Sequence, residues 1–172
     1  APAVAMGGTG TDAAIGVGAG VAVDAGVVAA ATLGIAGAAA LWWLYFDVVA
    51  LVAERSLAGL PRGRGRDDRG RDSYSYVHFP VVAGIVLLAL GLKKTVADVE
   101  HELGTVVASA MLGGAAIYLL AHVAFRLRNI GSLNRQRLVC AVVLVALIPF
   151  LARIPALVAL AILTGTLCGL VA

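Results

Sequence analysis

One long apolar segment that contains a single charge constrains this chain more than any other feature. Residues 25–52 carry no charged side chain except Asp47, and the segment is longer than the roughly 20 apolar residues that cross a bilayer as a helix. The run that ends in this carboxylate reads LWWLYFD, from Leu41 to Asp47. An ionisable group within a membrane span is costly unless it is paired, hydrated or near the interface, so Asp47 marks a candidate functional site.

The composition of the rest of the chain indicates that the bilayer is its solvent. Of the 172 residues, 61% are hydrophobic and 13% are charged, and the mean hydropathy is +0.98. A water-soluble domain of this size needs a more polar surface. We therefore predict an all-α, polytopic transmembrane helix bundle with about five spans. The predicted spans are residues 25–52, 76–92, 105–125, 138–151 and 154–172.

The predicted transmembrane domain covers residues 25–172, with a loop inside it and a short segment before it. Residues 1–24 are interpreted as a truncated helix remnant or an extracytoplasmic tail, because their apolar stretch is too short to span. Residues 56–73, rich in Gly and Arg, are expected to form a disordered cytoplasmic loop. The fourth span is short and contains Pro149, so it either borrows a turn from residues 134–137 or is a half-span.

The distribution of basic residues predicts how the spans are oriented. Arg residues gather in residues 55–71 and 126–137, whereas the intervening connections carry only Lys93 and Lys94, and later Arg153. By the positive-inside rule, the first and third connections then lie in the cytoplasm. This orientation places the C-terminus in the cytoplasm as well.

Polar side chains near the cytoplasmic ends of the spans allow two interpretations. In the first, Asp47 faces His78 and His122, with Tyr118 one turn before His122, and the group binds a proton or a cation. In the second, Asp47 and His78 lie in the headgroup layer beside an interfacial aromatic belt. The predicted belt consists of Trp42, Trp43, Tyr45 and Tyr76. Both interpretations stay open at this point.

Small residues spaced four apart indicate faces along which helices touch. The predicted packing glycines are Gly34, Gly113, Gly165 and Gly169. Because Ala, Gly and Val dominate the chain, such rows also arise by chance.

Few patterns in the sequence point to chemistry. Residues 98–102 read DVEHE, which favours an acid cluster at a helix start over a metal site. Cys140 and Cys168 lie in apolar segments without metal-ligand spacing, and no disulfide is expected. The chain lacks a nucleophile elbow, an H-E-x-x-H motif and a phosphate-binding loop. We expect neither an enzyme nor a protein that uses a cofactor or a metal, and nucleic acid is not an expected partner.

Two motifs together resemble those of a known family. Residues 40–47 read ALWWLYFD, and a Y-x-H-x-P-x-x-x-G-I pattern follows at Tyr76, His78, Pro80, Gly84 and Ile85. This combination resembles the bacterial low temperature requirement protein A (LtrA) family, and the resemblance covers most of residues 13–172. It implies an integral protein of the bacterial plasma membrane that corresponds to the C-terminal half of the family pattern. The implied partners are the lipid bilayer, the other helices of the same protein and further copies of the chain.

Two functions remain open on these grounds. A transporter- or channel-like protein with a proton- or cation-linked polar site fits a two-half architecture, in which such sites lie where the halves meet. A non-transporting scaffold or lipid-interacting protein that supports growth in the cold fits the aromatic belt and the Arg-rich loop. Replacing Asp47 by Asn should abolish function in the first case, whereas a scaffold should tolerate it.

Overall fold

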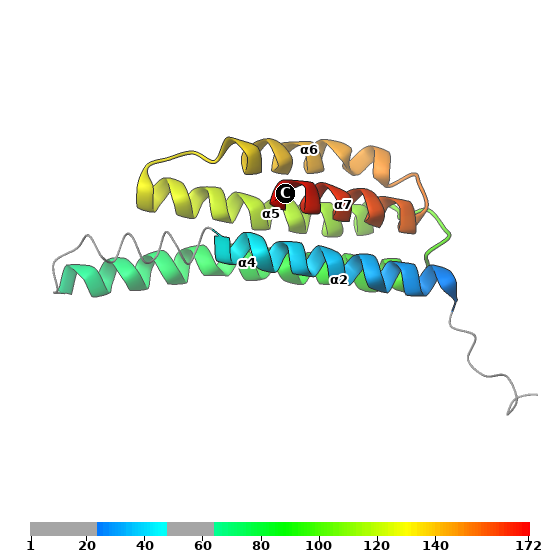
Figure 1. Ribbon diagram of the computed structural model, residues 1–172, viewed down its shortest axis with the longest axis horizontal. Coiled ribbons are helices and arrows are strands. Elements are labelled where there is room, and N and C mark those ends of the chain that lie inside the picture. The colour runs from blue at the N-terminus through cyan, green and yellow to red at the C-terminus, as the bar shows by residue number, and fades with distance from the viewer. Residues whose placement is uncertain (1–23, 48–63) are drawn as a thin grey trace, which may run out of the picture.

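The computed structural model describes residues 24–47 and 64–172, and within them the chain folds into five α-helices and no strand (Figure 1). The predicted all-α class is therefore confirmed. The tail expected at residues 1–23 and the part of the expected loop at residues 48–63 lie outside the described residues. The helices are α2 (Ala25–Tyr45), α4 (Arg64–Ala97), α5 (Thr105–Ile130), α6 (Arg135–Leu151) and α7 (Ala156–Val171).

Three of these helices are long and apolar enough to cross a membrane. They are α2, the part of α4 from His78 to Ala97, and the part of α5 from Thr105 to Arg128. Helix α7 is apolar but shorter. Helix α6 begins at Arg135, after Asn134 caps its first turn, so the helix of the fourth predicted span starts earlier than residue 138. It has 17 residues and is not among the helices long and apolar enough to cross a membrane.

Helix α4 begins earlier than the sequence suggested. Residues 64–73, for which we expected a disordered loop, form its first turns, and the prediction was wrong for them. Once the apolar part of a helix has formed, each further residue adds a hydrogen bond without a new nucleation cost, and Arg is a good helix former. Pro80 consequently lies within the helix and not near its start. Because Pro80 has no N–H group, the carbonyl of Tyr76 lacks its usual helical donor.

Helices α4, α5 and α6 pack in a row, and α2 packs mainly on α7. The contact between α4 and α5 is a backbone contact made possible by glycine. A Cβ atom on Gly84 would lie 2.7 Å from the carbonyl oxygen of Gly114, and one on Gly91 would lie 2.5 Å from the Cβ of Met111. Helix α5 is the centre of the bundle, with Met111 and Leu119 fully buried.

The predicted packing glycines are mostly not the ones that make contacts. A Cβ atom on Gly113, Gly165 or Gly169 would meet no atom within 4 Å among the described residues. Of the four, only Gly34 packs closely against another described residue, since a Cβ atom on it would lie 2.9 Å from a methyl group of Leu92. The other three face no neighbouring helix within the described residues, because spacing shows which residues share a face and not which face meets a neighbour.

The loops at one end of the bundle are joined by backbone hydrogen bonds. The loop between α4 and α5 meets the loop between α6 and α7, with Leu103 N donating to Ile154 O at 3.1 Å and Ala156 N donating to His101 O at 2.9 Å. Two further bonds, Gly104 N to Ala152 O and Leu157 N to Val99 O, complete the junction. The opposite end holds the C-terminal end of α2, the loop between α5 and α6, and Asp47.

Candidate functional site

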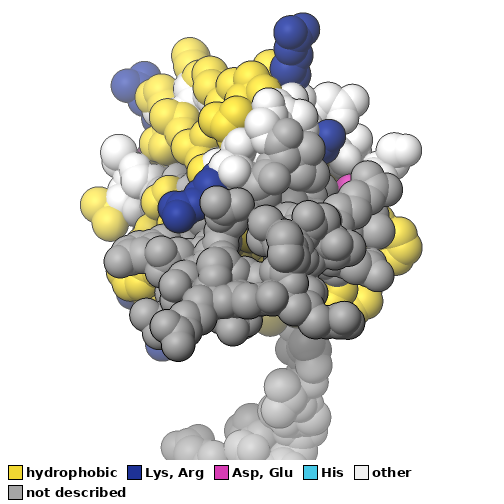
Figure 2. Space-filling model, turned by 90° about the vertical axis from the view of Figure 1, so that its left-hand side faces the viewer, with side chains coloured by type: hydrophobic (Ala, Val, Ile, Leu, Met, Phe, Trp, Pro, Cys, Tyr) yellow, Lys and Arg dark blue, Asp and Glu magenta, His cyan; other side chains and the backbone are white. Residues whose placement is uncertain are grey.

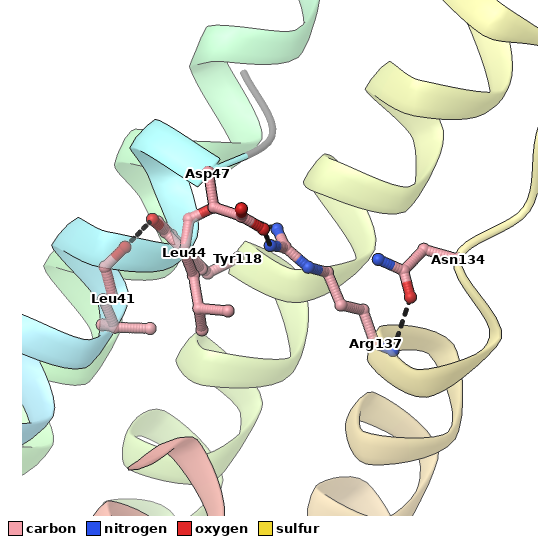
Figure 3. Close-up of polar contacts among 6 residues, drawn as sticks. All are labelled: Leu41, Leu44, Asp47, Tyr118, Asn134 and Arg137. Carbon is pink, nitrogen blue, oxygen red and sulfur yellow. Dashed lines mark hydrogen bonds and ion pairs between the residues drawn. The ribbon is translucent and has the colours of Figure 1, made fainter. Parts of the chain in front are cut away.

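An arginine that sequence reasoning did not select binds Asp47. Arg137 lies in the first turn of α6, where its backbone N–H donates to the side chain of Asn134 at 3.3 Å (Figure 3). Its side chain turns inward and only 3% of the residue is exposed. Nη2 of Arg137 lies 3.4 Å from Oδ2 of Asp47, and Nη1 donates to the carbonyl oxygen of Leu44 at 3.0 Å.

These two contacts explain how a buried guanidinium is tolerated here. Leu44 is in the last turn of α2, whose carbonyls lack helical donors and carry the negative end of the helix dipole. The guanidinium supplies both a donor and a positive charge at this point. The side chain of Asp47 is 60% exposed and that of Arg137 only 4%, so the ion pair is buried on one side. The pair ties α6 to the end of α2.

Tyr118 joins α5 to the same helix. Its hydroxyl donates to the carbonyl oxygen of Leu41 at 2.6 Å, and the residue is 2% exposed (Figure 3). Leu41 lies one turn before the Leu44 carbonyl that Arg137 binds. Side chains from two different helices thus donate to successive turns of α2.

His122 lies one turn beyond Tyr118 and is 1% exposed. Its Nδ1 is 2.8 Å from the carbonyl oxygen of Tyr118. A carbonyl can only accept, so Nδ1 carries a hydrogen and, in the neutral ring, Nε2 carries a lone pair. That Nε2 is buried and finds no hydrogen-bond partner among the described residues. The rings of Tyr118 and Tyr45 lie against the imidazole, with centroids 4.4 Å and 6.0 Å away.

His78 lies on α4, in the part of that helix that is long and apolar enough to cross a membrane. It lines a cavity of about 330 Å³ bounded by α2, α4 and α7, with Tyr45 and Tyr118 also in the wall. Of the four residues predicted to form one polar site, the structure brings Tyr118 and His122 into contact. Asp47 is connected to α6 through Arg137, and His78 and Tyr118 both line the cavity wall.

The aromatic side chains near Asp47 lie mostly on the outside of α2. Trp42 is 60% exposed and Trp43 is 57% exposed, while Tyr45 is half-buried. The ring of Phe46 packs against Trp42 with a centroid distance of 4.8 Å. The side chain of Tyr76 is not among those described. These positions suit rings that contact lipid near the end of a span.

The segment DVEHE forms a loop and not a helix start, so that prediction was wrong. Helix α5 begins only at Thr105, and its first turn holds no acidic residue. Nδ1 of His101 instead lies 2.6 Å from the carboxylate of Asp98. The pKa of the His101 imidazole is raised above its ordinary value, first by this hydrogen bond and then by the charge of Asp98.

The described part of the chain offers no cluster of metal ligands. Residues 24–47 and 64–172 contain no group of three or more His, Cys, Asp or Glu side chains placed to hold a metal ion. Cys140 is buried and Cys168 is exposed, and both are free thiols.

Sequence reasoning missed Arg137 because a long basic side chain at the start of a span was expected to reach outward to water. Arg137 could have been found from its position along the bundle axis, which is close to that of Asp47. Arg137 lies three residues into α6 from its cap, and Asp47 lies two residues beyond the end of α2 at the same end of the bundle. A carboxylate and a guanidinium at one depth in an apolar bundle stabilise each other.

A comparison with protein families supplies the remaining observation. The family model described as "Bacterial low temperature requirement A protein (LtrA)" matches residues 4–172, almost the whole chain. The chain belongs to the LtrA family. A search of curated proteins and a search of solved structures gave no match.

Membership of the LtrA family and the three apolar helices of membrane-spanning length agree with each other. This LtrA chain is an integral membrane protein. Buried polar contacts such as those of Arg137, Tyr118 and His122 therefore lie among helices whose outer surroundings are lipid, where unpaired polar groups are expensive.

Proposed function

We propose that this protein is a proton-linked, transporter-like membrane protein whose polar site consists of Asp47, Tyr118, His122 and Arg137. The single observation that carries the proposal is the buried His122, whose Nδ1 is fixed by Tyr118 and whose Nε2 has no partner among the described residues. Buried polar atoms in folded proteins are otherwise almost always hydrogen-bonded. An unmatched lone pair at this depth is an acceptor available for a proton or a donating group.

The ion pair favours a proton over a metal cation as the coupled species. A cation bound by Asp47 would face the guanidinium of Arg137, whose Nη2 lies 3.4 Å from the carboxylate. Like charges at such a distance repel. A proton accepted by His122 does not compete with Arg137 for the Asp47 carboxylate, although the imidazolium and the guanidinium repel each other.

Protonation of His122 would be coupled to movement of the helices. The groups that face its ring are Tyr45 on α2, Tyr118 on α5 and Arg137 on α6, and Arg137 is near enough to act on it electrostatically. Because an imidazolium and a guanidinium repel, a protonated His122 favours a conformation in which Arg137 moves away. Since Arg137 holds the end of α2, its movement would change the contact between α2 and α6.

Proton flux in proteoliposomes tests this proposal. A pH gradient should drive flux through the wild type, and His122→Asn should abolish it, because the Asn amide keeps a donor near the Nδ1 position but has no counterpart of Nε2. His101→Asn, in the exposed loop, is the matched control and should leave flux unchanged. If well-folded wild type shows no flux above empty liposomes, the proposal fails.

The alternative function, a non-transporting scaffold or lipid-interacting protein, makes the opposite prediction for Asp47. Under the transport proposal, Asp47→Asn weakens the hold of Arg137 and reduces flux without loss of folded protein. A scaffold would keep its effect on growth in the cold after the same substitution. Growth and flux measured on one set of variants separate the two.

The location and orientation proposed for the protein are the bacterial plasma membrane, with the Arg-bearing end and the C-terminus in the cytoplasm. The support is that residues 126–137 and the first turns of α4 lie at the same end of the bundle as the C-terminal end of α7. Gly65→Cys, in a chain without Cys140 and Cys168, tests it. A membrane-impermeant thiol reagent should label this variant only after lysis, and labelling of intact cells would reverse the orientation.

A further inference from the structure

The cavity beside His78 exists because α2 and α4 are held by different neighbours. Helix α4 is fixed to α5 by the contact of Gly84 with Gly114, whereas α2 is fixed to α7, where the hydroxyl of Thr164 donates to Leu33 O at 3.1 Å. The two helices come together where Gly34 meets Leu92. From there toward Tyr45 and His78 they leave a groove, which we call the α2–α4 groove.

The walls of the α2–α4 groove are almost entirely apolar. Its two buried hydroxyls are already used, since Tyr118 donates to Leu41 O and Thr164 donates to Leu33 O. The remaining polar side chains of the wall, those of Tyr45 and His78, lie at one end. An occupant of the groove therefore needs a hydrocarbon body and gains nothing from a polar group along its length.

The length and position of the groove match one leaflet of a bilayer. From Leu33 to Tyr45 the groove follows α2 for twelve residues, or about 18 Å. Half of a hydrocarbon core is roughly 15 Å thick. The groove ends at Tyr45 and His78, at the end of the bundle where Asp47 and the loop between α5 and α6 also lie, so it reaches the depth at which phospholipid headgroups begin.

The groove is continuous with the lipid-facing surface of this integral membrane protein. Val82 and Ile85 line it and are also 43% and 45% exposed, and Trp42 at its rim is 60% exposed. The outward side of α4 continues this surface with Phe79, Val86 and Leu90, all of them exposed. Lipid chains that border α2 and α4 therefore have direct access to the groove.

Charge at the same end suits a lipid headgroup. Figure 2 looks onto this end of the molecule, where Lys and Arg side chains stand out around the described hydrophobic ones. The sequence of the first turns of α4, which precede His78, adds four Arg residues and three Asp residues at this end. Those four are Arg64, Arg66, Arg69 and Arg71.

From these observations we infer that the α2–α4 groove binds one acyl chain of a bilayer phospholipid, with the headgroup at the His78 end. The groove wall includes none of His122, Asp47 and Arg137. It shares only Tyr118 with the proposed proton-linked site, and the hydroxyl of Tyr118 is already bonded to Leu41 O, so acyl-chain binding can be tested separately from proton flux. A bound chain would fill the space between α2 and α4 and support α2 on the side that protein does not cover.

Tryptophan fluorescence provides the test, since the chain has only two Trp residues and they differ in position. Trp42 lines the groove and Trp43 does not, although both are exposed. The variant Trp43→Phe keeps Trp42 as its single fluorescent reporter, and the variant Trp42→Phe keeps Trp43. Phosphatidylglycerol with brominated acyl chains is added to the protein in detergent micelles, and quenching is followed against the lipid fraction.

The inference expects saturable quenching of Trp42 at a lipid fraction roughly tenfold lower than that needed for Trp43, a ratio equivalent to about 1.4 kcal/mol. Ala38→Phe, which fills the groove from α2, should remove this difference, and Ala89→Phe should do the same from α4. Ala39→Phe, beside Ala38 but outside the groove wall, is the matched control and should preserve it.

Three results would overturn the inference. Quenching of Trp42 that rises linearly and equals that of Trp43 means that only bulk lipid is sensed. Resistance of Trp42 to quenching means that a segment of protein, from this chain or a second copy, fills the groove. Quenching by a brominated free fatty acid at low fraction, with none by the phospholipid, identifies a different ligand.

Discussion

Helices α4 and α2 both pack within the bundle, yet they are held in opposite ways. Helix α4 meets α5 through glycines, with backbone against backbone at Gly84 and Gly114. Helix α2 is held by three side chains from three helices, each of which donates to one of its carbonyls. These donors are Thr164 of α7, Tyr118 of α5 and Arg137 of α6.

This difference indicates which helix contacts can be broken and remade without the helices separating. A glycine contact is lost only if the helices separate, because it has no alternative partner and no charge. A side chain that donates to a carbonyl can rotate away and bond elsewhere, and interhelical hydrogen bonds in membranes contribute only about 0.6 kcal/mol on average. The α4–α5 pair is therefore the fixed part of the bundle, and α2 is the part whose attachment responds to charge.

The largest expected effect breaks the fixed part. Gly114→Leu should lower the free energy of unfolding by about 3 kcal/mol or more, since its Cβ would lie 2.6 Å from the backbone nitrogen of Leu88, which cannot move aside. Gly113→Leu is the matched control, because its Cβ meets nothing within 4 Å. Unfolding in mixed micelles with increasing SDS measures both. Equal losses for the two variants would contradict a glycine-dependent contact.

A smaller effect is expected from the charged attachment of α2. Arg137→Met should lower the free energy of unfolding by about 2 kcal/mol, because Leu44 O loses a charged donor and Asp47 loses its partner. Arg135→Met, exposed on the same turn, should change little. A double-mutant cycle with Asp47→Asn isolates the pair. A coupling near zero would show that Arg137 acts only through Leu44 O.

A still smaller effect is expected from the neutral attachment. Tyr118→Phe removes only the hydroxyl that donates to Leu41 O and should cost about 1 kcal/mol, within the range of interhelical hydrogen bonds in membranes. Tyr45→Phe, with the same chemical change on a half-buried ring, is the control. If Tyr118→Phe costs more than Arg137→Met, the charged contact is not the main attachment of α2.

The smallest effect concerns the opposite, exposed end of the bundle. The raised pKa of His101 should return toward its ordinary value in Asp98→Asn, as followed by NMR titration of the imidazole. A raised pKa in the folded state gives a stabilising contribution that is complete below the unfolded pKa and is lost as the pH rises through the folded pKa. Because the pair is fully exposed, we expect the unfolding midpoint to stay almost constant with pH. A large pH dependence of the unfolding midpoint would contradict this expectation, because it would mean that the exposed His101–Asp98 pair contributes substantially to stability.

The helical class and most helix positions could be predicted because they depend on single segments. The lengths of the apolar runs predict helices from residue 25 and from residue 138, and the structure has helices that begin at Ala25 and, one turn earlier than residue 138, at Arg135. The start of α4 could not be found in this way. Its first turns are polar and extend a helix that the apolar segment nucleates.

The partners within the candidate site could be predicted only in part. Asp47, Tyr118 and His122 attract attention as polar residues in apolar segments, and the structure brings two of them into contact. The pairing of Asp47 with Arg137 depends on which sides of α2 and α6 face each other. Helix α2 is apolar almost all round, so its sequence carries no periodic signal for that orientation. Likewise, the spacing of small residues in α5 does not reveal that Gly114, and not Gly113, faces α4.

The junction of the two loops fixes the distance between two helical hairpins at one end of the bundle. Four backbone hydrogen bonds fasten the hairpin of α4 and α5 to that of α6 and α7 at one end, while the other end is joined mainly by side chains. If the hairpins tilt about this fastened end by about 10°, a point 20 residues along a helix, roughly 30 Å away, moves by about 5 Å. A displacement of that size exceeds the 3.4 Å between Nη2 of Arg137 and Oδ2 of Asp47.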